Sequence, residues 1–374
     1  MKFVSALIFL LNLLALPTAA GETAHAKNER DRAYSDVSEL FESLARKSEQ
    51  GQFEEAAQLG VQAREFVLSN TREDSIERAQ YFLAVAQLLS VSNYRRREAL
   101  LDFSEQALTL YSRINEVQVD TLLKAHSLHI SALIEWSRWS ADSMSLDRLE
   151  RAIRVAEKKA KDHVSRASGD LFVTMSRAAN SKRKTKKLLK AAVDIYSLAL
   201  GQNSGLTLWT RAQAARQESE KKNARVLLEI LPLFKEDNES LQFKAAAQQQ
   251  LSVLFLKQGN DNQSLEQNIA AYETLKELGI QREFNAMDYT PVIKENPKYP
   301  TAAARNGVSG YVILEYAVTK TGAVEDISVI DSKPTGIFDE AAIEAAQKYR
   351  YMPRIVDGKP IDVPGVKTRI TFEI

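Results

Sequence analysis

The stretch PKYPTAAARNGVSGYVILEYAV, residues 297–318, decides how the end of this chain folds. From Tyr311 to Val318 the apolar side chains fall at every second position, namely at Val312, Leu314, Tyr316 and Val318. A period of two places them on one face of a β-strand. Lys320–Gly322 follows, with a glycine where a tight turn needs a left-handed backbone, and Val324–Ser332 then reads as the return strand. The sequence therefore predicts a β-hairpin here.

A helix and a last strand are predicted to complete this module. Apolar residues recur at steps of three and four from Phe338 to Tyr349, which is the stripe of an amphipathic helix. Pro353 cannot continue that helix. Alternation returns from Val366 to Ile374, so a strand is predicted there. With a short helix before the hairpin, the result is a small α+β domain.

The order of these elements resembles the C-terminal domain of the TonB family. The residues that carry the resemblance are Tyr299-Pro300, Gly307, Gly310, Gly322, Lys333-Pro334 with Phe338 soon after, and Tyr349-Arg350-Tyr351-Met352-Pro353. Each motif is common by itself, and their shared order is specific. The resemblance covers residues from about 289 to 374, less than a quarter of the chain.

The region upstream is predicted to be helical almost throughout. Between Asp36 and Gly279 proline occurs only at Pro232, and strand-like alternation is missing. Alanines and aromatic residues near Ala56 and again near Ala99 are similar to the second half of a tetratricopeptide repeat, with later copies every roughly 40 to 45 residues. Residues 30–282 are therefore predicted to form a TPR-like α-solenoid of about five or six helical hairpins. Residues 283–374 form the predicted TonB C-terminal-like domain.

The first residues have the pattern of a secretory signal peptide over residues 1–20. Lys2 precedes an apolar run from Phe3 to Leu16, and small residues follow Pro17. The run is shorter than the roughly 20 residues that span a bilayer. We therefore expect export to the periplasm. The alternative is an uncleaved anchor through residues 3–16 in the inner membrane.

Composition and motifs argue against several classes of protein. There is no cysteine, which excludes disulfides and thiolate metal sites, and the net charge of +1 gives no indication of a nucleic-acid partner. No pattern of catalytic residues or phosphate-binding loop is present, so we expect neither an enzyme nor a cofactor. His126 and His129 could share a helix face, but packing is favoured over a metal site because no carboxylate completes the set. The basic run 182–187 is either a solvated helix start or a surface for an acidic partner or an anionic lipid.

The predicted last strand carries the functional hypothesis. A strand at the edge of a sheet offers unpaired N–H and C=O groups to an extended peptide. The family resemblance implies that this region binds the TonB box of an outer-membrane transporter. The predicted contact residues are Val366, Lys367, Thr368, Arg369, Ile370, Thr371 and Phe372 in the strand and, by a looser resemblance, Tyr289, Thr290 and Pro291.

The predicted function is that of an exported envelope adaptor of the TonB system that supports energy-coupled transmembrane transport. Its C-terminal domain would bind the transporter, and the helical repeats would bind a protein partner. Components of the TonB/ExbB/ExbD complex are further candidate partners. The alternative is a structural or scaffolding envelope protein whose TonB-like domain has no role in uptake.

Overall fold

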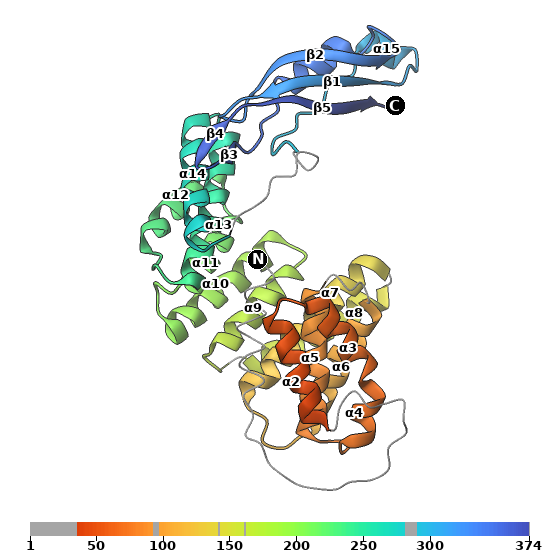
Figure 1. The fold of residues 1–374 in the computed structure, drawn as a ribbon, viewed down its shortest axis with the longest axis vertical. Helices are drawn as coiled ribbons and strands as arrows, with labels where there is room; N and C mark the ends of the chain where they lie inside the picture. The colour runs from red at the N-terminus through yellow and green to blue at the C-terminus, as the bar shows by residue number, and fades with distance from the viewer. Residues whose placement is uncertain (1–35, 93–96, 141–142, 161, 281–289, 374) are drawn as a thin grey trace. The chain divides into compact units, whose positions relative to one another are not determined.

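The computed structural model describes residues 36–373 except 93–96, 141–142, 161 and 281–289 (Figure 1). The predicted signal peptide, the predicted domain boundary at residues 282–283 and Tyr289 lie outside the described residues. The chain divides into two compact units, Met1–Ala199 and Leu200–Ile374. The last helices and the sheet domain therefore belong to the same unit.

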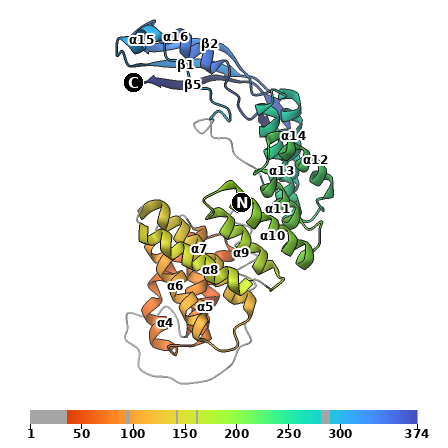
Figure 2. The ribbon, with the colours of Figure 1, turned by 180° about the vertical axis from the view of Figure 1, so that it is seen from behind.

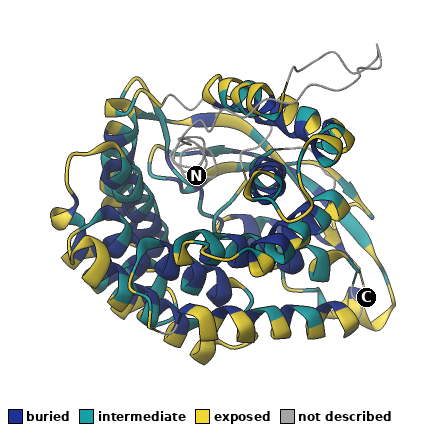
Figure 3. Ribbon diagram, turned by 90° about the horizontal axis from the view of Figure 1, so that it is seen from below, coloured by how far each residue is buried: buried dark blue, intermediate teal, exposed yellow. Residues whose placement is uncertain are grey.

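The first unit is entirely helical in its described part. Its helices are α2 (Val37–Glu49), α3 (Phe53–Gln62), α4 (Arg64–Asn70), α5 (Ile76–Val91), α6 (Arg97–Arg113), α7 (Val119–Ser140), α8 (Ser143–Ala160), α9 (Arg166–Arg177) and α10, which begins at Lys182 and ends at Leu200. Several begin at a side chain that accepts a hydrogen bond from the first turn, such as Asp36, Ser75 and Ser165. Most helices show one buried and one exposed face (Figure 3).

Helix α5 is the centre of this unit. Every residue from Tyr81 to Leu89 is buried, because α3, α4, α6 and α7 all pack against this helix. The aromatic rings of Tyr81, Phe82 and Phe103 meet at centroid distances of 5.2 to 5.9 Å. Ala56 on α3 is completely buried. Gly60 allows a close approach of α3 to α5, because a Cβ there would lie 2.6 Å from a methyl group of Val85.

The second unit begins with a further set of helices, α11 (Gly205–Ala215), α12 (Glu220–Ile230), η1 (Leu231–Leu233), α13 (Asn238–Lys257) and α14 (Asp261–Glu277). Pro232 lies in η1, where it ends the preceding α-helix. Helices α13 and α14 form an antiparallel pair beside α12 (Figure 2). The α13–α14 pair is a helical hairpin. The number of such hairpins in the chain and their likeness to tetratricopeptide repeats stay predictions.

A small sheet domain ends the chain. It contains α15 (Thr301–Arg305), β1 (Gly310–Val318), β2 (Val324–Lys333), α16 (Asp339–Ala346), β3 (Arg354–Val356), β4 (Lys359–Ile361) and β5 (Val363–Phe372). The main sheet is antiparallel with the order β2-β1-β5, as Figure 1 shows, and β3 pairs with β4. The inward side chains of β1, which the alternation predicted, are buried against α16. A mostly helical region followed by a small antiparallel sheet domain, as predicted, is confirmed.

Two glycines of the family resemblance have a structural reason. A Cβ on Gly310 would lie 2.1 Å from the carbonyl oxygen of Lys333. Gly322 has a φ of 89°, and a Cβ there would lie 2.0 Å from the carbonyl oxygen of Tyr351. Both positions therefore need a residue without a side chain.

The structure differs from the predicted elements at three places. Helix α16 ends at Ala346 instead of Tyr349, because the segment that follows leaves the helix to pair through Arg350 with Ile293. The β3–β4 hairpin was not predicted as strands. The final strand begins at Val363 instead of Val366, since the left-handed Gly365 lies at a register shift against β1 without ending the pairing.

The sheet domain contacts the α13–α14 pair within the second unit. The amide nitrogen of Asn268 donates to the carbonyl oxygen of Pro353 at 2.7 Å. The guanidinium of Arg350 lies 3.6 Å from the carboxylate of Asp261. The segment that follows α16 is therefore held from the helical side.

Candidate functional site: the outer edge of β5

Strand β5 lies at one side of the three-stranded sheet. One edge of it pairs with β1 from Val363 to Phe372, and among the described residues no strand pairs with its other edge, called the outer edge here. From Val366 to Phe372 the register against β1 is regular. This length of strand can accept a further extended segment.

The hydrogen bonds of β1 show which amides point to β5. Thr319 N–H donates to the carbonyl of Ala323 at 2.8 Å, and the carbonyl of Glu315 accepts from the hydroxyl of Ser328 at 3.2 Å. The backbone polar groups of odd-numbered β1 residues therefore point toward β2. Because these groups alternate along a strand, those of the even-numbered residues point toward β5.

The register then assigns the amides of β5. Val312 lies opposite Ile370, and Leu314 lies opposite Thr368. These β5 residues therefore exchange hydrogen bonds with β1, while the residues between them point their N–H and C=O groups outward. The inward set is Val366, Thr368, Ile370 and Phe372, and the outward set is Lys367, Arg369 and Thr371.

The outward set also has its side chains on the open face of the sheet, where all three are exposed. The guanidinium of Arg369 lies 4.0 Å from the centroid of the Tyr311 ring. The hydroxyl of Tyr311 donates to the carboxylate of Asp331 at 2.9 Å, and this bond raises the pKa of Tyr311. The ammonium of Lys367 lies 3.2 Å from the carboxylate of Glu315. Basic groups therefore line the open face beside the outer edge.

The opposite edge of the sheet is less suited to strand addition. Strand β2 has two register shifts against β1, and Asp326 within it has a φ of 54°. Glu325, Asp326 and Asp331 are exposed along it. Bulges and charged side chains are common protections of an edge strand.

The second predicted contact segment lies elsewhere in the domain. Thr290 is exposed and Pro291 is half-buried. Val292, the next residue, donates its N–H to the carbonyl of Arg350 at 2.8 Å. This segment is thus anchored near the end of α16, and its role in binding stays a prediction.

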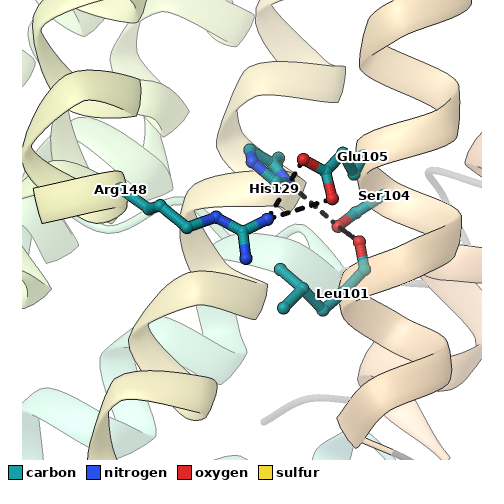
Figure 4. Close-up of polar contacts among 5 residues, drawn as sticks. All are labelled: Leu101, Ser104, Glu105, His129 and Arg148. Carbon is teal, nitrogen blue, oxygen red and sulfur yellow. Dashed lines mark hydrogen bonds and ion pairs between the residues drawn. The ribbon is translucent and has the colours of Figure 1, made fainter. Parts of the chain in front are cut away.

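The two histidines on α7 are buried. Burial lowers the pKa of His126 and of His129 to about 4. Nδ1 of His129 lies 3.2 Å from the hydroxyl of Ser104, which donates its only proton to the carbonyl of Leu101 (Figure 4). Nδ1 of His129 therefore carries a proton and donates it.

The carboxylate of Glu105 beside this pair is bonded to Arg148 at 3.0 Å through both oxygens (Figure 4). No group of three or more histidines and carboxylates in the described part of the chain could hold a metal ion. Both histidine side chains lie in the helical core, 4% and 7% exposed.

The helical part of the second unit has an open groove of ≈ 480 Å³. Ala224 and Leu228 of α12 and Phe255 of α13 contribute apolar surface to it, and Leu228 is 51% exposed. Lys221 and the ion pair of Arg225 with Glu229, at 3.0 Å, line its side. In the first unit, the basic run 182–187 begins α10 and is almost wholly exposed, in keeping with a solvated helix start.

An antiparallel sheet with helices on one face and a regular outer edge defines a class of small domains that can bind extended peptides by strand addition. The family model for the Gram-negative bacterial TonB protein C-terminal matches residues 295–374. These residues are therefore a TonB C-terminal domain, as predicted from the sequence.

Similar proteins match the same part of the chain. Protein TonB of Pseudomonas aeruginosa is 35% identical over 75 residues, which are 20% of this chain and 22% of that protein. Protein TonB of Escherichia coli (strain K12) is 30% identical over 81 residues, 22% of this chain and 31% of that protein. The solution NMR structure of the Pseudomonas aeruginosa TonB CTD is 31% identical, with 23% of this chain and 87% of that chain covered and a TM-score of 0.21. The chain thus spans less than a third of the length of these two full proteins.

No described helix has both the length and the apolar composition that crossing a membrane requires.

Proposed function

We propose that this chain is an exported adaptor of the TonB system that works in the periplasm. Its C-terminal domain binds the TonB box of an outer-membrane transporter along the outer edge of β5, and its helices bind a protein partner. In this way it supports energy-coupled transport across the outer membrane. The observation that carries the proposal is a regular outer edge in a TonB C-terminal domain.

The expected affinity is low. The outward set offers an N–H and a C=O group at each of Lys367, Arg369 and Thr371. About five hydrogen bonds at a net 0.5 to 1.5 kcal/mol each supply only a few kcal/mol. Binding would be micromolar at best. A weak complex suits a coupling protein, which has to release its transporter after each event.

The segment Thr290–Pro291, with Tyr289 before it, is proposed as a second contact with the transporter. Val292, which follows Pro291, donates its N–H to the carbonyl of Arg350, and this bond supports a fixed position for Thr290 and Pro291. Components of the TonB/ExbB/ExbD complex are proposed as further partners. The groove beside Leu228 is the place where the helices would hold a protein partner.

Export itself has a direct test. The signal-peptide pattern predicts a mature chain that begins at or near Gly21 and is recovered in the periplasmic fraction. Intact-mass measurement checks both this cleavage and the alternative. If Met1 is retained and the protein is found in the membrane pellet, the signal peptide is not cleaved, and residues 3–16 act as a membrane anchor.

The function is tested by peptide titration and by growth. TonB-box peptides from candidate transporters should bind the full chain, and a deletion strain should grow poorly when iron or vitamin B12 is scarce. Normal uptake through every transporter would refute the uptake role. The structural or scaffolding alternative would then be the better description.

A further inference from the structure

We propose that Lys367 and Arg369 select the bound peptide by charge, so that the outer edge of β5 prefers an extended segment in which acidic residues alternate with apolar ones. This inference rests on the proposed strand addition and adds the chemistry of the segment that binds. The two basic residues are the specificity-determining positions.

The alternation follows from the geometry of a sheet. Residues that lie side by side on neighbouring strands point their side chains to the same face, in parallel and in antiparallel pairs. Every second residue of an added strand would therefore lie on the open face, beside Lys367, Arg369 or Thr371. The residues between them would lie on the core face, beside Thr368 and Ile370.

The core face requires apolar side chains. Ile370 and Phe372 are 4% and 2% exposed, and Val366 and Thr368 are half-buried. A charged residue added beside them would lose water without a charged partner on β5. Apolar or β-branched residues would extend the existing core surface.

The open face favours negative charge at Lys367 and Arg369. Acidic groups on this face include Asp331 of β2 and Glu315 of β1, β5 contributes the two cations, and the acidic Glu373 follows only beyond the end of β5. Opposite charges on neighbouring strands stabilise the pair, and like charges directly opposite destabilise it. A glutamate or aspartate beside Arg369 therefore binds better than a lysine.

Arg369 is the stronger selector of the two. Its guanidinium rests on the ring of Tyr311, which is fixed in turn by Asp331, so less side-chain freedom is lost when a carboxylate binds. Lys367 already has the carboxylate of Glu315 at 3.2 Å. Removal of that carboxylate should strengthen the selection at Lys367.

The experiment compares two short synthetic peptides in which valine alternates with glutamate or with lysine. Each is titrated onto the full chain at low ionic strength. Each opposite-charge pair contributes up to about fivefold in affinity relative to uncharged side chains, so attraction at both positions should make the glutamate peptide bind more tightly by up to about twenty-fivefold. Repulsion of the lysine peptide should enlarge the ratio further. Added salt should reduce the ratio, because both groups are exposed.

The variants assign the preference to residues. Arg369→Glu should remove the preference for the glutamate peptide, because the charge at position 369 then opposes that of Lys367. Glu315→Gln should enlarge the preference for the glutamate peptide. Lys348→Glu is the matched control, because Lys348 is an exposed cation beyond α16 and outside the strands. It should leave the ratio of the two affinities almost unchanged.

The outcomes separate this inference from strand addition. Equal binding of both peptides, with no response to Arg369→Glu, would refute the charge selection and leave strand addition standing. If neither these peptides nor any TonB-box peptide binds, the proposed function itself is refuted. If Lys348→Glu also removes the preference for the glutamate peptide, the effect is one of general charge, and the inference is refuted.

Discussion

Proline at two neighbouring positions of β5 should have opposite consequences. Proline has no N–H group and can stay in a sheet only where that group is not needed. Thr371 points its amide outward, whereas Ile370 points its amide to Val312 on β1. Thr371→Pro should therefore weaken peptide binding in a folded domain, and Ile370→Pro should disrupt the domain.

The structure sets the two magnitudes. Thr371→Pro removes one outward donor, which is worth a net 0.5 to 1.5 kcal/mol, so the affinity for a TonB-box peptide should fall by about two- to twelvefold. Ile370→Pro removes a ladder hydrogen bond and replaces a branched side chain that is 4% exposed by a ring that is closed onto the backbone nitrogen and cannot fill the same space. Together these losses should cost about 3 to 5 kcal/mol, a large part of the stability of a small domain.

The assay is peptide titration combined with hydrogen exchange of β1 and β5 in the full chain. Thr371→Ala and Ile370→Ala are the controls, because each removes side-chain atoms and keeps the N–H group. Unchanged affinity in Thr371→Pro, with exchange in β1 also unchanged, would refute binding along the outer edge. Disruption by Thr371→Pro and tolerance of Ile370→Pro would show that the assignment of the amides is reversed.

Three further predictions follow from packing and burial. Ala56→Leu should overpack the contact of α3 with α5 and cost about 1 to 3 kcal/mol, and a first unit that melts like the parent would contradict this. Burial lowers the pKa of His126 and His129 to about 4, so between pH 6.5 and 4 the unfolded chain binds more protons than the folded chain. The free energy of unfolding of the first unit should therefore be highest above about pH 6.5 and fall by about 2 to 3 kcal/mol per histidine toward pH 4. Hydrogen exchange of α6 and α7 against pH measures this fall, and replacement of both histidines by glutamine should flatten the profile. Asn268→Ala should remove the bond to Pro353, cost about 1 kcal/mol and increase hydrogen exchange in β3 and β4, whereas unchanged exchange there would show that this contact does not hold the sheet domain.

The sequence was sufficient to predict those strands in which apolar and polar residues alternate over many positions. The alternation from Tyr311 to Val318 predicted β1 and its buried face, and the same pattern predicted most of β5. The three-residue strands β3 and β4 carry no such pattern. Their hairpin is determined by Asp357 and Gly358, which both have positive φ values, and by pairing that only a folded chain shows.

The candidate site was predicted as a strand at the edge of a sheet, but the sequence did not assign which of its amides point outward. Alternation of side chains shows which residues face the core, and it does not show the side of the strand on which each N–H lies. That assignment needed the bonds of Thr319 and Glu315 on the neighbouring strand. The sequence placed Lys367 and Arg369 among the predicted contact residues but did not show their partners. They are exposed, but each is held beside a partner on β1.

The two edges of this sheet solve the problem of unwanted pairing differently. A long and regular edge can pair with another copy of itself, and β2 avoids this through bulges and acidic side chains. Strand β5 is regular from Val366 to Phe372, so its backbone is not protected in this way. Two β5 edges that met would bring Lys367 and Arg369 of one copy close to the same cations of the other, and like charges on neighbouring strands are unfavourable. The same cations favour an acidic partner, so one pair of side chains can discourage self-association and admit a peptide along the only regular edge of the described sheet.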